Sequence, residues 1–173
     1  LMDIRSFLDS TYLKTASQAG LDEAQNTEVV KAFINDAVVE SFKLVMIRPE
    51  MVALAKQIIL ASSSSVKIGT VIDFPEGKST IEDKLIAANK AIADGADELD
   101  FVCNYNAFKT GAIDLVKEEV LKGTKLALDH HKVAKWIIEV AALTDDQIIQ
   151  LSALIKNTVM ANFKEDCYSN VFV

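Results

Sequence analysis

The sequence predicts an α/β fold in which parallel strands alternate with helices. Two observations carry this prediction: short apolar runs of strand length recur along the chain, and segments with apolar residues at helical spacing separate them. Strands joined through helices pair in parallel by right-handed crossovers, and the helices then cover the sheet. With 173 residues the chain can bury a sizeable core, so we expect one domain over 1–173.

The first half of the chain predicts three strands, each of which ends in polar residues or proline. They are expected at 7–11, 44–47 and 66–72. The first helix is expected at 27–40, where the apolar residues follow helical spacing. The second begins at Pro49, which suits a first turn, and the third follows a capping box of Ser79 and Glu82 and ends at Gly95.

The second half predicts three more strands, which brings the total to six strands alternating with five helices. These strands are expected at 95–104, 133–139 and 170–173. A loop at 104–111 leads into a helix at 113–131. Thr144 and Gln147 form a second capping box, which opens the last helix. A polar link at 162–166 precedes the final strand.

The composition excludes several classes of function. A net charge of −7 argues against a nucleic-acid partner, which needs clustered lysine and arginine, but it allows a small phosphorylated substrate. The two cysteines, Cys103 and Cys167, suggest reduced thiols rather than a disulfide framework or a zinc site. The printed sequence indicates neither a membrane span nor a secretory signal, so we expect a cytoplasmic protein without a membrane partner.

Two motifs resemble ligand-binding motifs, but each lacks features that ligand binding would require. Gly77-Lys-Ser79 follows a strand and opens a helix, as in a phosphate-binding P-loop, yet Pro75 removes an amide donor and Glu76 adds negative charge. A capped helix start explains these residues better. His130 and His131 are adjacent, and side chains of adjacent helical residues diverge by about 100°, so a helix end is favoured over a metal site.

Asp100 and Lys135 are the strongest candidates for a site. Asp100 interrupts a buried strand pattern, where a carboxylate must be paired, hydrogen-bonded or protonated. Lys135 lies in the next expected strand. Asp100 is two positions from Val102 and Lys135 is two positions from Ile137, so both charged side chains could point to the buried side of the sheet. A structural salt bridge and an active site are about equally compatible with this pattern. Asp9, Thr11 and Asn104 also lie at strand ends, where α/β folds place their chemistry, and this favours a site.

Five motifs in order resemble the deoxyribose-phosphate aldolases. They are Leu8-Asp-Ser-Thr-Tyr-Leu-Lys14, Val45-Met-Ile-Arg-Pro49, Gly69-Thr-Val-Ile-Asp-Phe-Pro-Glu-Gly77, Gly95-Ala-Asp-Glu-Leu-Asp100 and Lys135-Trp-Ile-Ile-Glu139 with Leu143-Thr-Asp145. The resemblance implies a (β/α)8 TIM barrel, of which strands one to six are present here. It also implies a class I lyase that reversibly splits 2-deoxy-D-ribose 5-phosphate into acetaldehyde and D-glyceraldehyde 3-phosphate in deoxyribonucleotide catabolism.

The resemblance also implies roles for individual residues. Asp100 matches the proton-transferring acid and Lys135 a second active-site lysine, while Asp9 and Thr11 match pocket residues of the first strand. Asn104 is a further pocket candidate. Neither a metal nor an organic cofactor is implied, and a homodimer remains open as the quaternary state.

The lysine that forms the Schiff base in this family follows an apolar run like that of 170–173, and no lysine of this chain matches it. We therefore expect a fragment that ends just before the catalytic lysine and is inactive by itself. Two alternatives are a non-catalytic, aldolase-like binding protein and a barrel enzyme that acts on another aldehyde or sugar phosphate.

Overall fold

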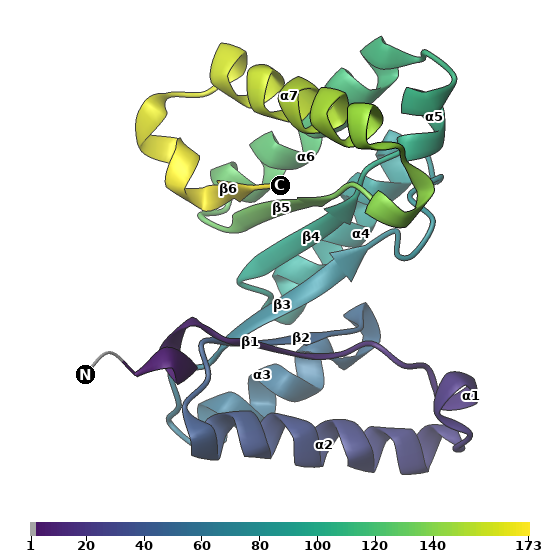
Figure 1. Ribbon diagram of the computed structural model, residues 1–173. Helices are drawn as coiled ribbons and strands as arrows, with labels where there is room; N and C mark the ends of the chain where they lie inside the picture. The colour runs from purple at the N-terminus through teal and green to yellow at the C-terminus, as the bar shows by residue number, and fades with distance from the viewer. Residues whose placement is uncertain (1–2) are drawn as a thin grey trace. The chain divides into compact units, whose positions relative to one another are not determined.

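The computed structural model describes residues 3–173 and divides the chain into two compact units (Figure 1). The first unit consists of residues up to 70 together with 93–97, and the second of 71–92 together with 98–173. Six strands alternate with helices along the chain, as the sequence predicts. The expectation of one domain over the whole chain stays a prediction.

In the first unit, three parallel strands follow one another in chain order. Thr11 of the first strand pairs with Met46 of the second, and Met46 pairs with Gly69 of the third. Figure 1 shows the two longer helices on the same side of the first two strands. The elements are β1 (Asp9–Tyr12), α1 (Ala16–Ala19), α2 (Glu23–Glu40), β2 (Leu44–Ile47), α3 (Val52–Ala61) and β3 (Lys67–Ile72), with 3-10 turns at Ile4–Phe7 and Pro49–Met51. The last two residues of β3, Val71 and Ile72, belong to the second unit.

In the second unit, three further parallel strands again follow in chain order. Lys135 in the middle strand pairs with Asp100 on one side and with Phe172 on the other. The elements are α4 (Ile81–Asp94), β4 (Glu98–Val102), α5 (Tyr105–Lys109), α6 (Ile113–Asp129), β5 (Val133–Ile137), α7 (Asp145–Asn162) and β6 (Val171–Phe172), with 3-10 turns at Val140–Ala142 and Glu165–Asn170. The last two residues of α4, Ala93 and Asp94, belong to the first unit.

The face of β4 and β5 that packs against α6 forms an aromatic core. The rings of Phe101 and Trp136 stack with their centroids 4.9 Å apart, and Trp136 Nε1 donates a hydrogen bond of 3.0 Å to Thr124 Oγ1 on α6. Gly123 leaves room for the indole, because an added Cβ would lie 2.9 Å from its ring carbons. Side chains alternate along a strand, so Asp100 and Lys135 lie on the opposite face.

The prediction of the first strand is wrong at its start. Phe7 belongs to a 3-10 turn, which the Asp3 carboxylate opens by accepting a hydrogen bond of 3.1 Å from the backbone N–H of Arg5. The strand therefore begins at Asp9 rather than at Phe7. The cap at Asp3 stabilises the 3-10 turn, in which backbone N–H groups have hydrogen-bond partners. An edge strand would leave some of these groups without a partner, so the turn forms although the residues are apolar.

The predicted cap of α4 is wrong by one residue. Thr80, not Ser79, caps this helix, because Thr80 Oγ1 accepts a hydrogen bond of 3.1 Å from the backbone N–H of Asp83. Ser79 instead binds Asp73, which follows β3. The predicted capping box of Thr144 and Gln147 is confirmed.

Several other boundaries differ from the predictions. Helix α2 starts at Glu23, four residues before the predicted start, because Asp22 and Gln25 form a capping box. The expected loop at 104–111 contains the short helix α5, and β5 ends at Ile137 because Glu139 has a φ of 50°. Within residues 3–173, none of the helices combines the length and the apolarity that crossing a bilayer requires.

Candidate active site

Asp100 and Lys135 lie side by side on two neighbouring strands. They are partners in the register of β4 and β5, and both are half-buried on the face that points away from α6. The strands place them together because parallel pairing aligns residues of equal parity on one face. The predicted placement of Asp100 and Lys135 on neighbouring strands is confirmed by this register, whereas their roles in a site stay predictions.

Glu98 is a third charged residue on this face, and it is not among the site residues predicted from the sequence. Its Oε2 lies 2.7 Å from Lys135 Nζ, and its side chain is only 6% exposed, compared with 19% for Lys135. Glu98 precedes Asp100 by two residues, so its parity alone places it on the same face. The spacing of two residues between Glu98 and Asp100 was therefore sufficient to predict Glu98 as a site residue from the sequence.

A pocket of about 420 Å³ opens beside these side chains at the carboxyl ends of the strands. It is lined by Asp100, Lys135, Trp136, Ile137, Ile138, Glu139, Val140, Phe172 and Val173. Carboxylates and an ammonium group stand there among apolar side chains, the combination that acid–base chemistry on a small polar molecule requires.

Asn104 also lies at the carboxyl end of β4, but its side chain serves the backbone. Its Oδ1 accepts a hydrogen bond of 2.9 Å from the N–H of Ala107 and so caps α5. Its own N–H donates to Glu119 Oε1 at 2.9 Å. A role of Asn104 in the pocket stays a prediction.

The other two predicted pocket residues, Asp9 and Thr11, belong to β1 in the first unit. Asp9 Oδ1 lies 3.6 Å from Lys43 Nζ, and Thr11 is exposed. Their part in a site stays a prediction.

A second cluster of charges lies deeper in the second unit, around Lys84 of α4. The Lys84 side chain is 2% exposed, and its Nζ donates hydrogen bonds to the carbonyl oxygens of Gly77 at 2.9 Å and Val102 at 2.8 Å. Glu119 Oε2 lies 3.0 Å from the same nitrogen and Asp73 Oδ2 lies 3.5 Å from it. One ammonium group therefore connects two helices with the ends of two strands.

The burial of this cluster changes the acidity of its neighbours. Burial raises the pKa of the Glu119 carboxyl, and the nearby Lys84 ammonium offsets only part of that effect. Burial also raises the pKa of the Cys103 thiol, so this cysteine stays protonated and unreactive at neutral pH. These residues are suited to holding the structure rather than to attacking a substrate.

Helical periodicity in the sequence marks Lys84 and Glu119 of this cluster as buried. The buried residues of α4 are Lys84, Ala88 and Ala91, which share one helical face, so a lysine occupies a core position. Glu119 occupies the same kind of position between Val116 and Val120 on α6. The helical pattern thus marks both charges as buried, and the packing of the two helices pairs them.

The two motifs that resemble ligand sites have structural roles here. Asp73 accepts hydrogen bonds from the N–H of Ser79 at 2.8 Å and from its hydroxyl at 2.7 Å, so a carboxylate occupies the position that a phosphate would take in a P-loop. His130 ends α6, and both histidines are exposed. Among residues 3–173, no group of three histidine, cysteine or acidic side chains is placed to hold a metal ion.

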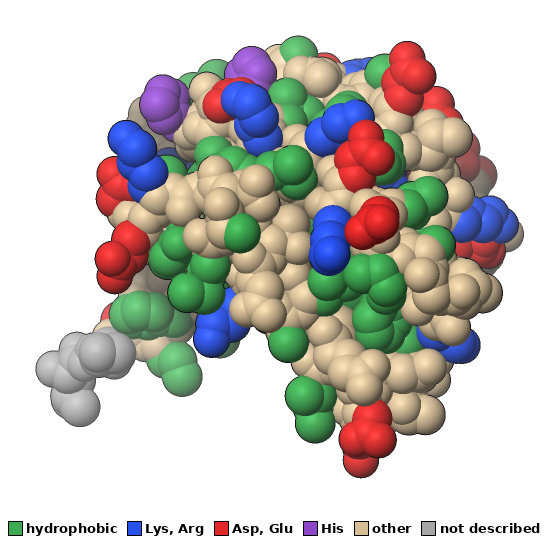
Figure 2. Space-filling view, turned by 90° about the horizontal axis from the view of Figure 1, so that it is seen from above, with side chains coloured by type: hydrophobic (Ala, Val, Ile, Leu, Met, Phe, Trp, Pro, Cys, Tyr) green, Lys and Arg blue, Asp and Glu red, His purple; other side chains and the backbone are tan. Residues whose placement is uncertain are grey.

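The surface carries mixed charge on the face that Figure 2 presents, where lysine and arginine side chains stand beside aspartate and glutamate. Exposed ion pairs also occur on α6, where Lys122 Nζ lies 2.5 Å from Glu118 Oε1 and Lys125 Nζ lies 2.7 Å from Asp129 Oδ2. Such alternation differs from the basic stripe that a nucleic-acid backbone requires.

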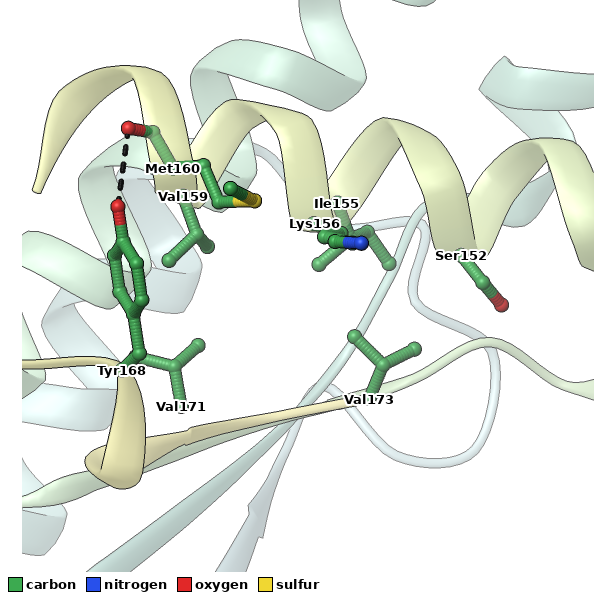
Figure 3. Close-up of a pocket in the computed structure, with 8 residues that line it drawn as sticks. All are labelled: Ser152, Ile155, Lys156, Val159, Met160, Tyr168, Val171 and Val173. Atoms are coloured by element: carbon green, nitrogen blue, oxygen red, sulfur yellow. Dashed lines mark hydrogen bonds between the residues drawn. The ribbon is translucent and has the colours of Figure 1, made fainter. Parts of the chain in front are cut away.

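A second pocket of about 420 Å³ lies between α7 and β6 (Figure 3). Its walls are mainly apolar, and the Tyr168 hydroxyl donates a hydrogen bond of 3.2 Å to the carbonyl oxygen of Met160 at one end. It is lined by Ser152, Ile155, Lys156, Val159, Met160, Tyr168, Val171 and Val173. Because no carboxylate lines it, it lacks the paired acid and base of the first pocket.

The chain is similar in sequence to deoxyribose-phosphate aldolases. Those of Thermococcus gammatolerans and Caldicellulosiruptor saccharolyticus are 36% and 32% identical to it over 155 and 154 residues. The alignments cover 90% and 88% of this chain but 65% and 66% of the relatives, so the chain spans slightly less than two thirds of their length. No protein-family model matches the chain.

Solved structures agree with this similarity. A tetrameric deoxyribose phosphate aldolase from Aeropyrum pernix superposes with a TM-score of 0.72 at 25% identity, over 91% of this chain and 59% of that one. The aldolase QR15 superposes with a TM-score of 0.73 at 25% identity, over 95% of this chain and 80% of that one. The alternation of strands and helices and the likeness to these aldolases confirm the predicted α/β barrel class of fold.

Proposed function

We propose, from the homology of this chain to the deoxyribose-phosphate aldolases, that the protein is an aldehyde lyase acting on 2-deoxy-D-ribose 5-phosphate. The products are acetaldehyde and D-glyceraldehyde 3-phosphate, and the reaction is reversible. The observation that carries the proposal is the register pair of Asp100 and Lys135 beside a pocket at the carboxyl ends of the strands.

The reaction proceeds through an imine. A lysine amine adds to the aldehyde carbon C1 of the open-chain sugar, and the carbinolamine loses water to give the iminium ion. A base takes the proton of the C3 hydroxyl, and the C2–C3 bond breaks as the C3 oxygen becomes the carbonyl oxygen of the departing D-glyceraldehyde 3-phosphate. The electrons of that bond form the C1–C2 double bond of an enamine, and the iminium π electrons move to nitrogen. Protonation of C2 and addition of water then release acetaldehyde and restore the amine.

Asp100 is the proposed proton carrier in these steps. Its carboxyl lies on the pocket face of β4, where it can take a proton from one intermediate and return it to the next. Lys135 is the proposed cation beside the reacting amine. Its Nζ lies 2.7 Å from Glu98 Oε2, which holds the long side chain in place.

The reacting lysine is expected after Val173, because no lysine of residues 1–173 matches it in the resemblance. The test is to incubate the full gene product with acetaldehyde and borohydride, which reduces the imine to N-ethyl-lysine, and to map the adduct by mass spectrometry. We expect the adduct on a lysine beyond Val173 and no turnover by residues 1–173 alone. An adduct on Lys135 would contradict the assignment.

Cleavage assays of variants test the role of Asp100. Asp100→Asn keeps the size of the side chain but removes the proton carrier, so kcat should fall by about 10²–10⁴-fold. Glu118→Gln on the exposed surface of α6 is the matched control and should leave kcat unchanged. A gene product that binds the sugar phosphate but forms no imine would be the non-catalytic, aldolase-like protein instead.

A further inference from the structure

We propose that Lys84 and Glu119 are positioning residues of the active site, which hold the carboxyl ends of β3 and β4 in the geometry that catalysis requires. This inference rests on the proposed aldolase function. Neither residue lines the pocket of Asp100 and Lys135, so both act through the backbone of the strands that carry it.

Lys84 binds the backbone on both sides of the junction between these strand ends. The carbonyl of Gly77 belongs to the loop after β3, and the carbonyl of Val102 ends β4, two residues after Asp100. Both accept hydrogen bonds from the same ammonium group, so a movement of either strand end breaks a bond to a buried charge. Hydrogen bonds to a charged donor are roughly twice as strong as neutral ones.

Glu119 completes the arrangement from α6. Its Oε2 lies 3.0 Å from Lys84 Nζ, and its Oε1 accepts the N–H of Asn104 at 2.9 Å. Asn104 in turn caps α5. The carboxylate therefore holds the first residues after β4 while it neutralises the lysine.

The loop after β3 has little freedom to adapt. Asp73 has a φ of 60° and binds Ser79, and an added Cβ on Gly77 would lie 2.5 Å from the carbonyl oxygen of Cys103. The loop backbone thus touches the end of β4 directly. Close packing transmits a shift of the loop to the strand, and a misplacement of about 1 Å in an active site can cost about 10²-fold in rate.

A chemical role for Lys84 itself does not fit its surroundings. Its side chain is 2% exposed and its nitrogen already donates to two carbonyl oxygens. A nucleophilic amine needs a free lone pair and access to the substrate. The cluster therefore orders the strand ends and leaves the chemistry to the pocket.

The test uses the full gene product and distinguishes a loss of catalytic activity from a loss of folding stability. Lys84→Met alone leaves two buried carboxylates without their cation and should lower the urea midpoint of unfolding strongly. The double variant Lys84→Met/Glu119→Leu also removes the nearer of the two carboxylates and should regain part of that midpoint. Its kcat should still fall by about 10²-fold while KM changes by less than about threefold, because the strand ends lose their anchors.

Two further variants sharpen the result. Glu119→Gln keeps an acceptor for the N–H of Asn104 and should retain more kcat than Glu119→Leu. The double variant Lys122→Met/Glu118→Leu makes the same chemical change to an exposed pair of α6 and should leave kcat unchanged.

Hydrogen exchange at residues 102–107 provides a readout that does not depend on the reaction. It should quicken in Lys84→Met/Glu119→Leu and not in the surface control. If the wild-type gene product cleaves no substrate, the proposed function fails, whereas unchanged exchange contradicts the positioning role by itself. An active wild type together with a folded double variant of wild-type kcat would also overturn this inference.

Discussion

Lys135 Nζ lies 2.7 Å from Glu98 Oε2, so a largely buried carboxylate one strand away holds the lysine of the candidate site. Glu98→Gln keeps the shape of the side chain but removes its charge. We expect the free energy of unfolding to fall by about 2 kcal/mol, because Lys135 is then left in a partly buried position without this counter-charge. Urea denaturation of the full gene product measures the change.

The matched control for this variant is Glu118→Gln, in the exposed pair with Lys122. Exposed pairs contribute about 0–1 kcal/mol, so the control should change stability little. Equal effects of the two substitutions would show that the burial of Glu98 adds nothing to its ion pair.

Gly77 and Gly20 test the contact between the loop after β3 and the end of β4. Both glycines have a left-handed backbone, with φ of 65° and 69°, so alanine costs about 1–2 kcal/mol at either position. At Gly20 an added Cβ meets nothing within 4 Å, whereas at Gly77 it would lie 2.5 Å from the carbonyl oxygen of Cys103. Gly77→Ala should therefore cost about 1–3 kcal/mol more than Gly20→Ala in chemical denaturation.

If the two alanine variants unfold at the same denaturant concentration, the loop moves away from β4 without cost. That result would also weaken the argument that Lys84 holds two strand ends in contact.

Gly123 tests the aromatic core beneath the site. Alanine favours helix formation by about 1 kcal/mol over glycine, but the added Cβ would lie 2.9 Å from the Trp136 ring. Overpacking typically costs about 1–3 kcal/mol, so Gly123→Ala should destabilise the protein or at best leave it unchanged. In a Trp136→Phe background the smaller ring makes room, and Gly123→Ala should then be stabilising by thermal unfolding.

The same sign of effect in both backgrounds would contradict the assigned contact. The double-mutant comparison isolates it because both substitutions are measured with and without the other.

Glu119 makes stability depend on pH. Burial raises the pKa of its carboxyl above the ordinary value of 4.5, so the folded protein binds this proton more tightly than the unfolded chain. The stabilisation from that proton is present below pH 4.5 and is lost as the pH rises through the folded pKa. Glu119→Gln carries no such proton, so the stability of wild type relative to the variant should fall as the pH rises from 4 towards 7.

Thermal unfolding of both proteins at several pH values checks this. A wild type that gains stability relative to the variant over this range would mean that the Lys84 ammonium, rather than burial, controls the pKa of Glu119.

Local patterns in the sequence determined the alternation of strands and helices and the shared face of Asp100 and Lys135. Both follow from short-range periodicity, because residues two apart in a strand must lie on one side of it. The same patterns failed where a local cap competed with them, as at Phe7 and at Ser79.

Only the tertiary structure decided which charges meet. Glu98 is the partner of Lys135, and Lys84 of α4 meets Glu119 of α6, because strand pairing and helix packing bring together residues that are distant in the chain. A periodic pattern marks a charged residue as buried but not its partner, since the partner depends on how whole elements dock. For this protein the sequence thus identified the acid and the lysine of the candidate site, and the fold identified the residues that hold them.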